Sequence, residues 1–375
     1  MRCLLMRGGT SRGPFFDARD LPADTAQRDA VLLAVMGSPD PLQVDGLGGG
    51  HPLTSKAGIV APGRDGIDVE WTFAQLQPDS DRVDTTPNCG NMLAAVLPFA
   101  IETGMVVPDS DTTTARVLTR NTGAVAEITV RTPAGPDGQR FVRYDGEARI
   151  DGVPGTAAPV RIGFLDTAGS VAGSLLPTGN VRDTLDVPDL GAIDVTLIDN
   201  GQPLVVVDAR DLGATGAESP EEIDADDALR ARIEALRIVA GHAMGLGDVT
   251  EKSYPKMTLV SAPRHGGAIG TRSLIPHRTH RSIGVLAAVT AATAAVLPGS
   301  VAYDLAVLPP VTTTPDGSET TLSVEHPTGE FSVTLGLDPD DPTRVTRSAL
   351  LRTARLIMAG QAMVPSSLWT QETPA

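Results

Sequence analysis

The sequence contains few cysteines, few lysines and no long hydrophobic run, and each shortage excludes a class of protein. Its 375 residues include two cysteines, Cys3 and Cys89, too few for a disulfide framework or a four-thiol metal site. The longest uncharged apolar run covers residues 283–297 and is short for a membrane span. The N-terminal residues contain no apolar stretch of signal-peptide length. We therefore expect a reduced, cytoplasmic protein without a membrane segment.

Positive charge is also scarce, because 30 basic residues face 46 acidic ones and give a formal net charge of −16. Such a chain is a poor candidate for binding nucleic acid or an anionic membrane. An anionic small molecule would have to be bound by a local cluster of positive groups. Any such cluster in this sequence is therefore informative.

Only three of the 30 basic residues are lysines, namely Lys56, Lys252 and Lys256. Arginine does not release a proton near neutral pH, whereas lysine does. A chain with this arginine bias is expected to keep lysine where an amine matters. Lys56 is the first candidate, and the alternative is a solvated residue at the edge of a strand.

Length and composition predict two α+β domains. Apolar residues make up 41% of the chain, and 39 glycines with 30 prolines favour many turns and short strands. We place the N-terminal domain at 1–184 and the C-terminal domain at 185–344. Helices are expected over 26–36, from Asn88 through about 102, over 220–244 and over 281–297. Strands are expected at 3–7, 13–16, 57–61, 69–76, 115–120, 124–131, 140–150, 160–165, 193–200, 203–209, 256–263, 267–276, 320–327, 330–337 and 349–360.

The two halves follow the same plan. In each, several strands lead to a polar turn and then to a very apolar helix of small residues. Cys89 and Ser282 occupy equivalent places before these helices. This pattern predicts two similar α+β domains, each with a central helix.

Cys89 is the best candidate for chemistry, because the first turn of a helix stabilises a thiolate. The alternative is a buried structural cysteine, which is the better interpretation of Cys3 in its apolar strand. A Cys–His hydrolase has little support, and no G-x-S-x-G motif is present.

Three segments have the composition of anion-binding sites. Residues 7–13 (RGGTSRG) and 45–50 (DGLGGG) offer small residues and accessible backbone amides. Residues 277–282 (HRTHRS) place two histidines and two arginines before a helix. His277 and His280 have no third ligand at metal spacing, so we expect no metal.

Six ordered motifs resemble the PrpF-like isomerase family: MRGGTSRGPFF, DGLGGGHPLTSK, NCGNMLAAVLPFAIE, LLPTGN, HRTHRSIGVLAAVTAATA and VEHPTGEF. They span about residues 1–360. The resemblance implies the diaminopimelate-epimerase-like fold, in which each domain is a curved, mostly antiparallel sheet around a central helix and the active site lies between the domains. It also implies that the last strand returns to the first domain, so that 345–375 completes the N-terminal domain at 1–184. Further stretches, RIDGVPG and SLLPTGNVRD among them, are most similar to the 4-oxalomesaconate tautomerases. The implied reaction interconverts 4-oxalomesaconate and 4-carboxy-2-hydroxymuconate in aromatic-acid breakdown.

The family's catalytic residues fall on Cys89 and Lys56, and its substrate-contacting serine falls on Ser11. Arg12 stands where the family usually has lysine, which preserves a charge but not a proton-transfer role. The resemblance implies no cofactor, a small di- or tricarboxylate substrate and a homodimer. Other substrate-binding residues are expected within the matching segments: Arg7, Thr10, Gly48, Gly49, Ser55, Asn91, Thr178, Asn180, Arg272, His277, Arg278, His280, Arg281 and Ser282.

In the expected mechanism, one of Cys89 and Lys56 removes a proton beside a keto group, and either residue returns it at the tautomeric position. Two alternatives remain open. One is a double-bond shift on methylaconitate or methylitaconate. The other is a non-catalytic polycarboxylate-binding or accessory protein.

Overall fold

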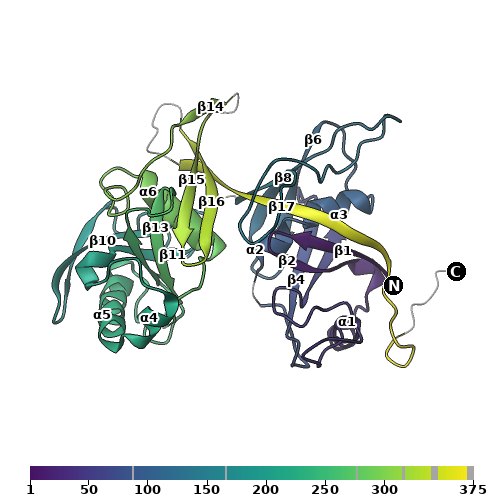
Figure 1. The fold of residues 1–375 in the computed structure, drawn as a ribbon, viewed down its shortest axis with the longest axis horizontal. Helices are drawn as coiled ribbons and strands as arrows, with labels where there is room; N and C mark the ends of the chain where they lie inside the picture. The colour runs from purple at the N-terminus through teal and green to yellow at the C-terminus, as the bar shows by residue number, and fades with distance from the viewer. Residues whose placement is uncertain (87, 165–166, 276–277, 315–316, 339–344, 370–375) are drawn as a thin grey trace. The chain divides into compact units, whose positions relative to one another are not determined.

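The computed structural model describes residues 1–375 except 87, 165–166, 276–277, 315–316, 339–344 and 370–375. The chain forms two compact units (Figure 1). Unit 1 comprises Met1–Phe164 with Leu351–Ala375, and unit 2 comprises Leu165–Leu350. Both contain strands and helices, so the fold is of the mixed class.

The strands of unit 1 pair in a closed ring. In ring order, neighbours are β17, β1, β2, β3, β4, β6, β7, β8 and again β17. The β2–β3 and β4–β6 pairs are parallel, while β1–β2, β3–β4, β6–β7, β7–β8 and β1–β17 are antiparallel. The strands are β1 Arg2–Gly8, β2 Ser11–Asp17, β3 Lys56–Pro62, β4 Val69–Leu76, β5 Val83–Asp84, β6 Thr112–Thr119, β7 Val125–Arg131, β8 Pro159–Phe164 and β17 Val345–Gln361.

Two short helices fill this ring of strands. Helix α2 (Gly90–Leu93) contacts β1 and β2, and α3 (Val96–Glu102) contacts β3, β4 and β7. The sequence predicts one helix here, but Pro98 has no N–H to donate to the carbonyl of Ala94, so the helix is interrupted. Helix α1 (Thr25–Met36) packs elsewhere in the unit and ends at Gly37, which has a left-handed conformation with φ of 79°.

Unit 2 places its most apolar helix, α6 (Val285–Val296), against strands β10, β11, β15 and β16. Ten residues of α6 are buried. Alanine and threonine side chains allow this close packing on the sheet. The other elements are β9 Asp183–Val187, β10 Gly191–Asp199, β11 Pro203–Asp208, α4 Pro220–Ala225, α5 Asp227–Ala243, β12 Lys256–Ser261, β13 Ile269–Leu274, β14 Thr312–Thr314, β15 Gly317–His326 and β16 Gly329–Leu337, and short 3₁₀ turns lie at Ala18–Asp20 and Ala209–Leu212.

The unit boundaries lie at 164/165 and 350/351, whereas the sequence pattern placed them at 184/185 and 344/345. The segment before β9 belongs to unit 2 because Asp199 binds it. The Asp199 carboxylate accepts hydrogen bonds from the backbone N–H groups of Val171 at 2.7 Å and Ala172 at 2.8 Å. Strand β17 begins in unit 2, where its first residues pair with β16, and ends in unit 1 beside β1.

One predicted strand is wrong. Residues 140–150 form no strand, and only isolated bridges at Arg140 and Ala148 involve them. The chain instead folds back on itself, because Gly152 and Gly155 adopt left-handed φ values of 78° and 79°. Ala148 and Ala157 then exchange backbone hydrogen bonds of 2.9 and 3.0 Å.

Candidate active site

The side chains of Lys56 and Cys89 are in contact within unit 1. Lys56 is the first residue of β3 and is 7% exposed. Its Nζ donates a hydrogen bond to the Sγ of Cys89 at 3.5 Å. The same ammonium lies 5.6 Å from the ring centroid of Phe73, on the neighbouring strand β4. A thiol and an amine in contact can exchange a proton, and the ammonium stabilises the thiolate.

Cys89 itself is the N-cap of α2, with φ of −133° and ψ of 98°. The sequence predicted Asn88 as the cap, but the side-chain oxygen of Asn88 accepts the backbone N–H of Cys89 at 2.9 Å instead. Because α2 has only four residues, its dipole is short. The ammonium of Lys56 is therefore the stronger source of thiolate stabilisation.

Glycines of the first hairpin bring β1 and β2 against these elements. A Cβ on Gly8 would lie 2.3 Å from the carbonyl oxygen of Asn91, and one on Gly13 would lie 1.8 Å from that of Lys56. The side-chain amide of Asn91 donates to Oγ1 of Thr10 at 3.0 Å. The motif around residues 7–13 thus adjoins both the helix that Cys89 caps and the strand that begins at Lys56.

Ser11 and Arg12 begin β2 within this motif. Ser11 is fully buried, and its hydroxyl has no hydrogen-bond partner among the described residues. A buried hydroxyl without a partner is costly, so Ser11 is suited to contact a bound ligand. The Nε of Arg12 is likewise buried without a partner in the described structure.

Gln43 holds the second glycine-rich segment in place through hydrogen bonds. No motif in the sequence marks it as a site residue. Its Oε1 accepts hydrogen bonds from Ser55 Oγ at 2.7 Å and from the backbone N–H of Gly50 at 3.0 Å. A Cβ on Gly48 would lie 2.1 Å from that Oε1, and one on Gly49 would lie 2.5 Å from Thr54 Oγ1. These glycines and Ser55 therefore shape the loop before Lys56, and their contact with substrate remains a prediction.

Arg352 is a further charged residue beside Cys89 that the sequence analysis missed. It lies on β17, is 7% exposed, and its Nη1 donates to the carbonyl of Leu351 at 2.8 Å. Burial lowers the pKa of Arg352 to about 10, and its attraction to Cys89 acts in the opposite direction. The available signal was an arginine next to a run of apolar residues in the strand pattern ALLRTARLIM, which contains two arginines.

The alternation of side chains along the strand explains why Arg352 faces Cys89. Residue Gly8 of β1 is paired with Ala354 of β17 and packs against α2. Arg352 lies two positions from Ala354 and so shares its face. Arg7 pairs with Arg355 on the opposite face and lines a different cavity.

In unit 2, three predicted substrate-binding residues form hydrogen bonds with other residues of the protein. Thr178 Oγ1 and Asn180 Nδ2 donate to the two carboxylate oxygens of Asp183 at 2.7 and 2.8 Å. Arg272 donates from Nε to the carbonyl of Glu218 and from Nη1 to that of Thr271. Their binding of substrate remains a prediction.

The predicted basic segment forms a polar corner before α6, which begins at Val285 rather than at 281. The Nδ1 of His280 accepts the backbone N–H of Ser282 at 2.8 Å, and Ser282 Oγ lies 3.2 Å from Nε2 of His326. Burial, and secondly the charge of Lys256, lower the pKa of His280.

The other members of this segment differ in their surroundings. Arg281 forms an exposed ion pair with Glu221 at 2.7 Å, and the Arg278 side chain is exposed. His277 lies outside the described residues. His326 is the residue of this corner that the sequence analysis did not select as a site residue.

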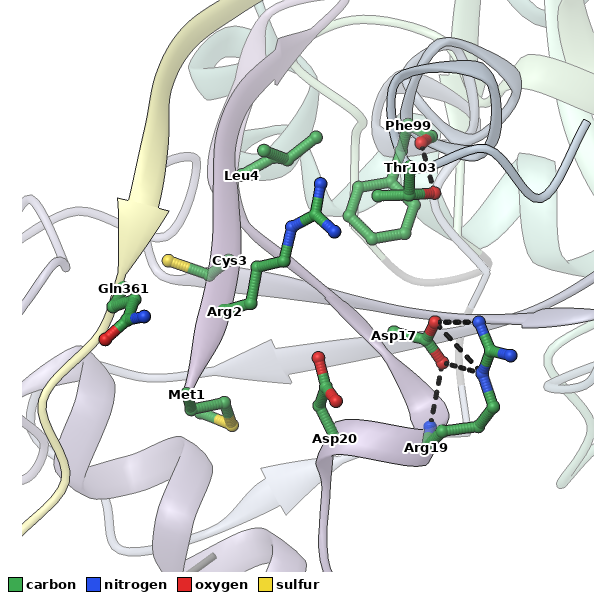
Figure 2. A pocket seen from close by; sticks show the side chains of 10 residues that line it. All are labelled: Met1, Arg2, Cys3, Leu4, Asp17, Arg19, Asp20, Phe99, Thr103 and Gln361. Atoms are coloured by element: carbon green, nitrogen blue, oxygen red, sulfur yellow. Dashed lines mark hydrogen bonds and ion pairs between the residues drawn. The ribbon is translucent and has the colours of Figure 1, made fainter. Parts of the chain in front are cut away.

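Cys3 lies in different surroundings from the Lys56–Cys89 pair. It lines a cavity of about 420 Å³ at the start of β1 (Figure 2). Burial raises the pKa of its thiol. Figure 2 also shows that Arg19, one of two arginines that line this cavity, is paired with the carboxylate of Asp17 at 2.6 Å.

Among the described residues, no three or more His, Cys, Asp or Glu side chains are grouped so that they could hold a metal ion. None of the helices in these same residues is both long and apolar enough to cross a membrane.

A thiol and an amine in contact are suited to proton transfer. Over nearly its whole length the chain is similar to isomerases. The chain belongs to the PrpF family, whose model, described as PrpF protein, matches residues 1–365. It is an isomerase of that family.

Relatives extend over nearly the whole chain. The (4E)-oxalomesaconate Delta-isomerase of Novosphingobium sp. is 53% identical, over 96% of this chain and 97% of that protein. The 4-oxalomesaconate tautomerase of Pseudomonas putida is 49% identical, over 98% of this chain and 97% of that protein. The crystal structure of a methylitaconate-delta-isomerase, 33% identical, matches with a TM-score of 0.84 over 100% of this chain and 98% of that one.

Proposed function

We propose that this isomerase converts 4-oxalomesaconate to 4-carboxy-2-hydroxymuconate, with Cys89 and Lys56 as its acid–base pair. The observation that carries the proposal is the 3.5 Å contact between Lys56 Nζ and Cys89 Sγ. The substrate is taken from the two relatives that are 53% and 49% identical and whose names contain oxalomesaconate.

The chemistry requires one proton to leave carbon and one to arrive at oxygen. A base of the pair takes a proton from the carbon between the keto group and the alkene. The C–H electron pair forms a new C=C bond, and the carbonyl π electrons move to oxygen. The acid of the pair, or the same group after accepting the proton, then protonates that oxygen. Each substrate proton lost is matched by one returned, so the reaction is an isomerisation.

Charge around the pair favours the enolate intermediate. The Lys56 ammonium and the buried Arg352 guanidinium both lie beside Cys89 and stabilise a developing negative charge. We include Arg352 in the proposal as a residue whose positive charge acts on Cys89 and on the developing enolate. Ser11, Thr10 and Asn91, on adjoining elements, are proposed to bind a substrate carboxylate.

The finer fold is part of the same proposal. We assign the chain to the diaminopimelate-epimerase-like fold because each unit buries an apolar helix against its strands, α2 and α3 in unit 1 and α6 in unit 2. Ser282 then stands in unit 2 where the cysteine of unit 1 stands, and it is proposed to bind substrate rather than to carry a proton.

The experiment compares three substrates by proton NMR and ultraviolet absorbance: 4-oxalomesaconate, methylitaconate and methylaconitate. We expect rapid formation of the conjugated dienol from 4-oxalomesaconate and little turnover of the others. A product that keeps its keto group but has a shifted C=C bond would identify a Delta-isomerase instead. Turnover of methylitaconate or methylaconitate alone would contradict the proposal, and binding without turnover would indicate an accessory protein.

A further inference from the structure

A second cavity in unit 1 contains two arginines on one face of the sheet. Its volume is about 530 Å³, and it lies between the segment 144–157 and residues of β1 and β17. All of its lining residues belong to unit 1. The segment includes RIDGVPG, which the sequence analysis used only as a family motif.

Arg7 and Arg355 are direct cross-strand partners in the antiparallel pair of β1 and β17. Like charges placed opposite each other on a sheet are destabilising. Burial, and secondly the charge of Arg355, lower the pKa of Arg7. Neither guanidinium forms an ion pair with a described residue, although the exposed Asp145 also lines the cavity. A repelling pair of this kind, in a chain of net charge −16, is explained if it binds an anion.

The guanidinium of Arg7 is held in place. Its Nη1 donates to the carbonyl of Gly9 at 2.9 Å and to Thr353 at two atoms, the carbonyl at 3.1 Å and Oγ1 at 2.9 Å. These acceptors are uncharged, so they fix the group without neutralising it. The cavity of Figure 2 also contains two arginines, Arg2 and Arg19, but there Asp17 pairs with Arg19 and a second carboxylate, Asp20, lines the cavity.

The remaining wall of the cavity is largely apolar. Ile150 and Val153 come from the folded-back segment, and Ile357, which is 46% exposed, comes from β17. An inorganic anion would leave these side chains in contact with water. A carboxylate attached to a hydrocarbon body satisfies both the guanidinium pair and the apolar wall.

We propose that this cavity is a binding site for a small organic carboxylate, whose carboxylate group contacts Arg7 and Arg355 and whose hydrocarbon part packs on Ile150, Val153 and Ile357. The site is separate from the catalytic pair. Neither Lys56 nor Cys89 is among the residues that line the cavity.

The test is isothermal titration calorimetry of the full chain with phthalate as the probe. We expect wild-type protein to bind phthalate at millimolar concentration or below, and Arg355→Gln to weaken that binding at least about 10-fold, the equivalent of one lost charged contact. Arg131→Gln, which removes an exposed arginine from β7 of the same unit, is the matched control and should bind as wild type. Arg355→Lys should retain part of the affinity.

Several results would overturn the proposal. The first is no binding of phthalate to the wild type, and the second is equal binding by Arg355→Gln. The third is binding that Lys56→Met abolishes but Arg355→Gln does not, because that result would place the probe at the catalytic pair. Inorganic phosphate binding as tightly as phthalate would contradict the role of the apolar wall. An unchanged thermal unfolding transition of Arg355→Gln shows that its loss of binding is not a loss of folding.

Discussion

Replacing Lys56 with methionine removes the positive charge beside Cys89 while keeping a side chain of similar length. At the observed separation of 3.5 Å, two unit charges interact by about 1 kcal/mol in water and about 5 kcal/mol at the effective dielectric constant of protein sites. The lower figure already changes an equilibrium several-fold. We therefore expect the reactivity of the Cys89 sulfur in Lys56→Met to fall several-fold or more.

Alkylation by iodoacetamide measures this reactivity, because the thiolate is the reacting form. Cys3 is 1% exposed and does not interfere. Lys252→Met is the matched control, since Lys252 binds the carbonyl of Leu246 at 2.8 Å in unit 2. Mass spectrometry of the Cys89 peptide gives the rate for each variant. A Lys56→Met protein alkylated as fast as wild type would refute the electrostatic role assigned to Lys56.

Three further substitutions test other parts of the structure. Gly13→Ala would place a Cβ 1.8 Å from the Lys56 carbonyl, so β3 must move; kcat should fall by about 10- to 100-fold, and the temperature of thermal unfolding should fall as well. Arg352→Met should lower kcat, because a buried positive charge beside Cys89 is lost, and steady-state kinetics check this. Burial raises the pKa of Glu325, but hydrogen bonds from the backbone N–H groups of Arg264, Gly267 and His265 outweigh burial and lower the pKa overall. Glu325→Gln should therefore cost about 2 kcal/mol of stability at pH 7. This difference should disappear as the pH falls through the lowered pKa, and urea unfolding at several pH values measures it.

Where local pattern decided the structure, the sequence was sufficient. The helix predicted at 26–36 is found at Thr25–Met36, because Gly37 ends it, and the strand predicted at 69–76 is found at Val69–Leu76. The strand predicted at 140–150 failed because its apolar residues pack in a folded-back segment that two left-handed glycines permit. Short strands such as Val83–Asp84 carry no periodicity and were missed.

Long-range contacts limited the prediction of the site. Cys89 and Lys56 could be selected as individual residues, but their contact depends on the pairing of β2 with β3 and on the fit of Gly13 against Lys56. Arg352 was missed because it lies far along the sequence, in a strand that joins unit 1 through long-range pairing with β1 and β8. Gln43 has an unremarkable sequence context, and its role appears only in the hydrogen bonds of the loop.

The central claim is that Cys89, assisted by Lys56, moves a proton on 4-oxalomesaconate. The most direct measurement is the tautomerisation of 4-oxalomesaconate in deuterated buffer containing a metal chelator, followed by proton NMR for the wild type and for Cys89→Ser. The account predicts rapid turnover with loss of the proton signal beside the keto group in the wild type, and neither in Cys89→Ser. Full turnover and exchange by Cys89→Ser would contradict it.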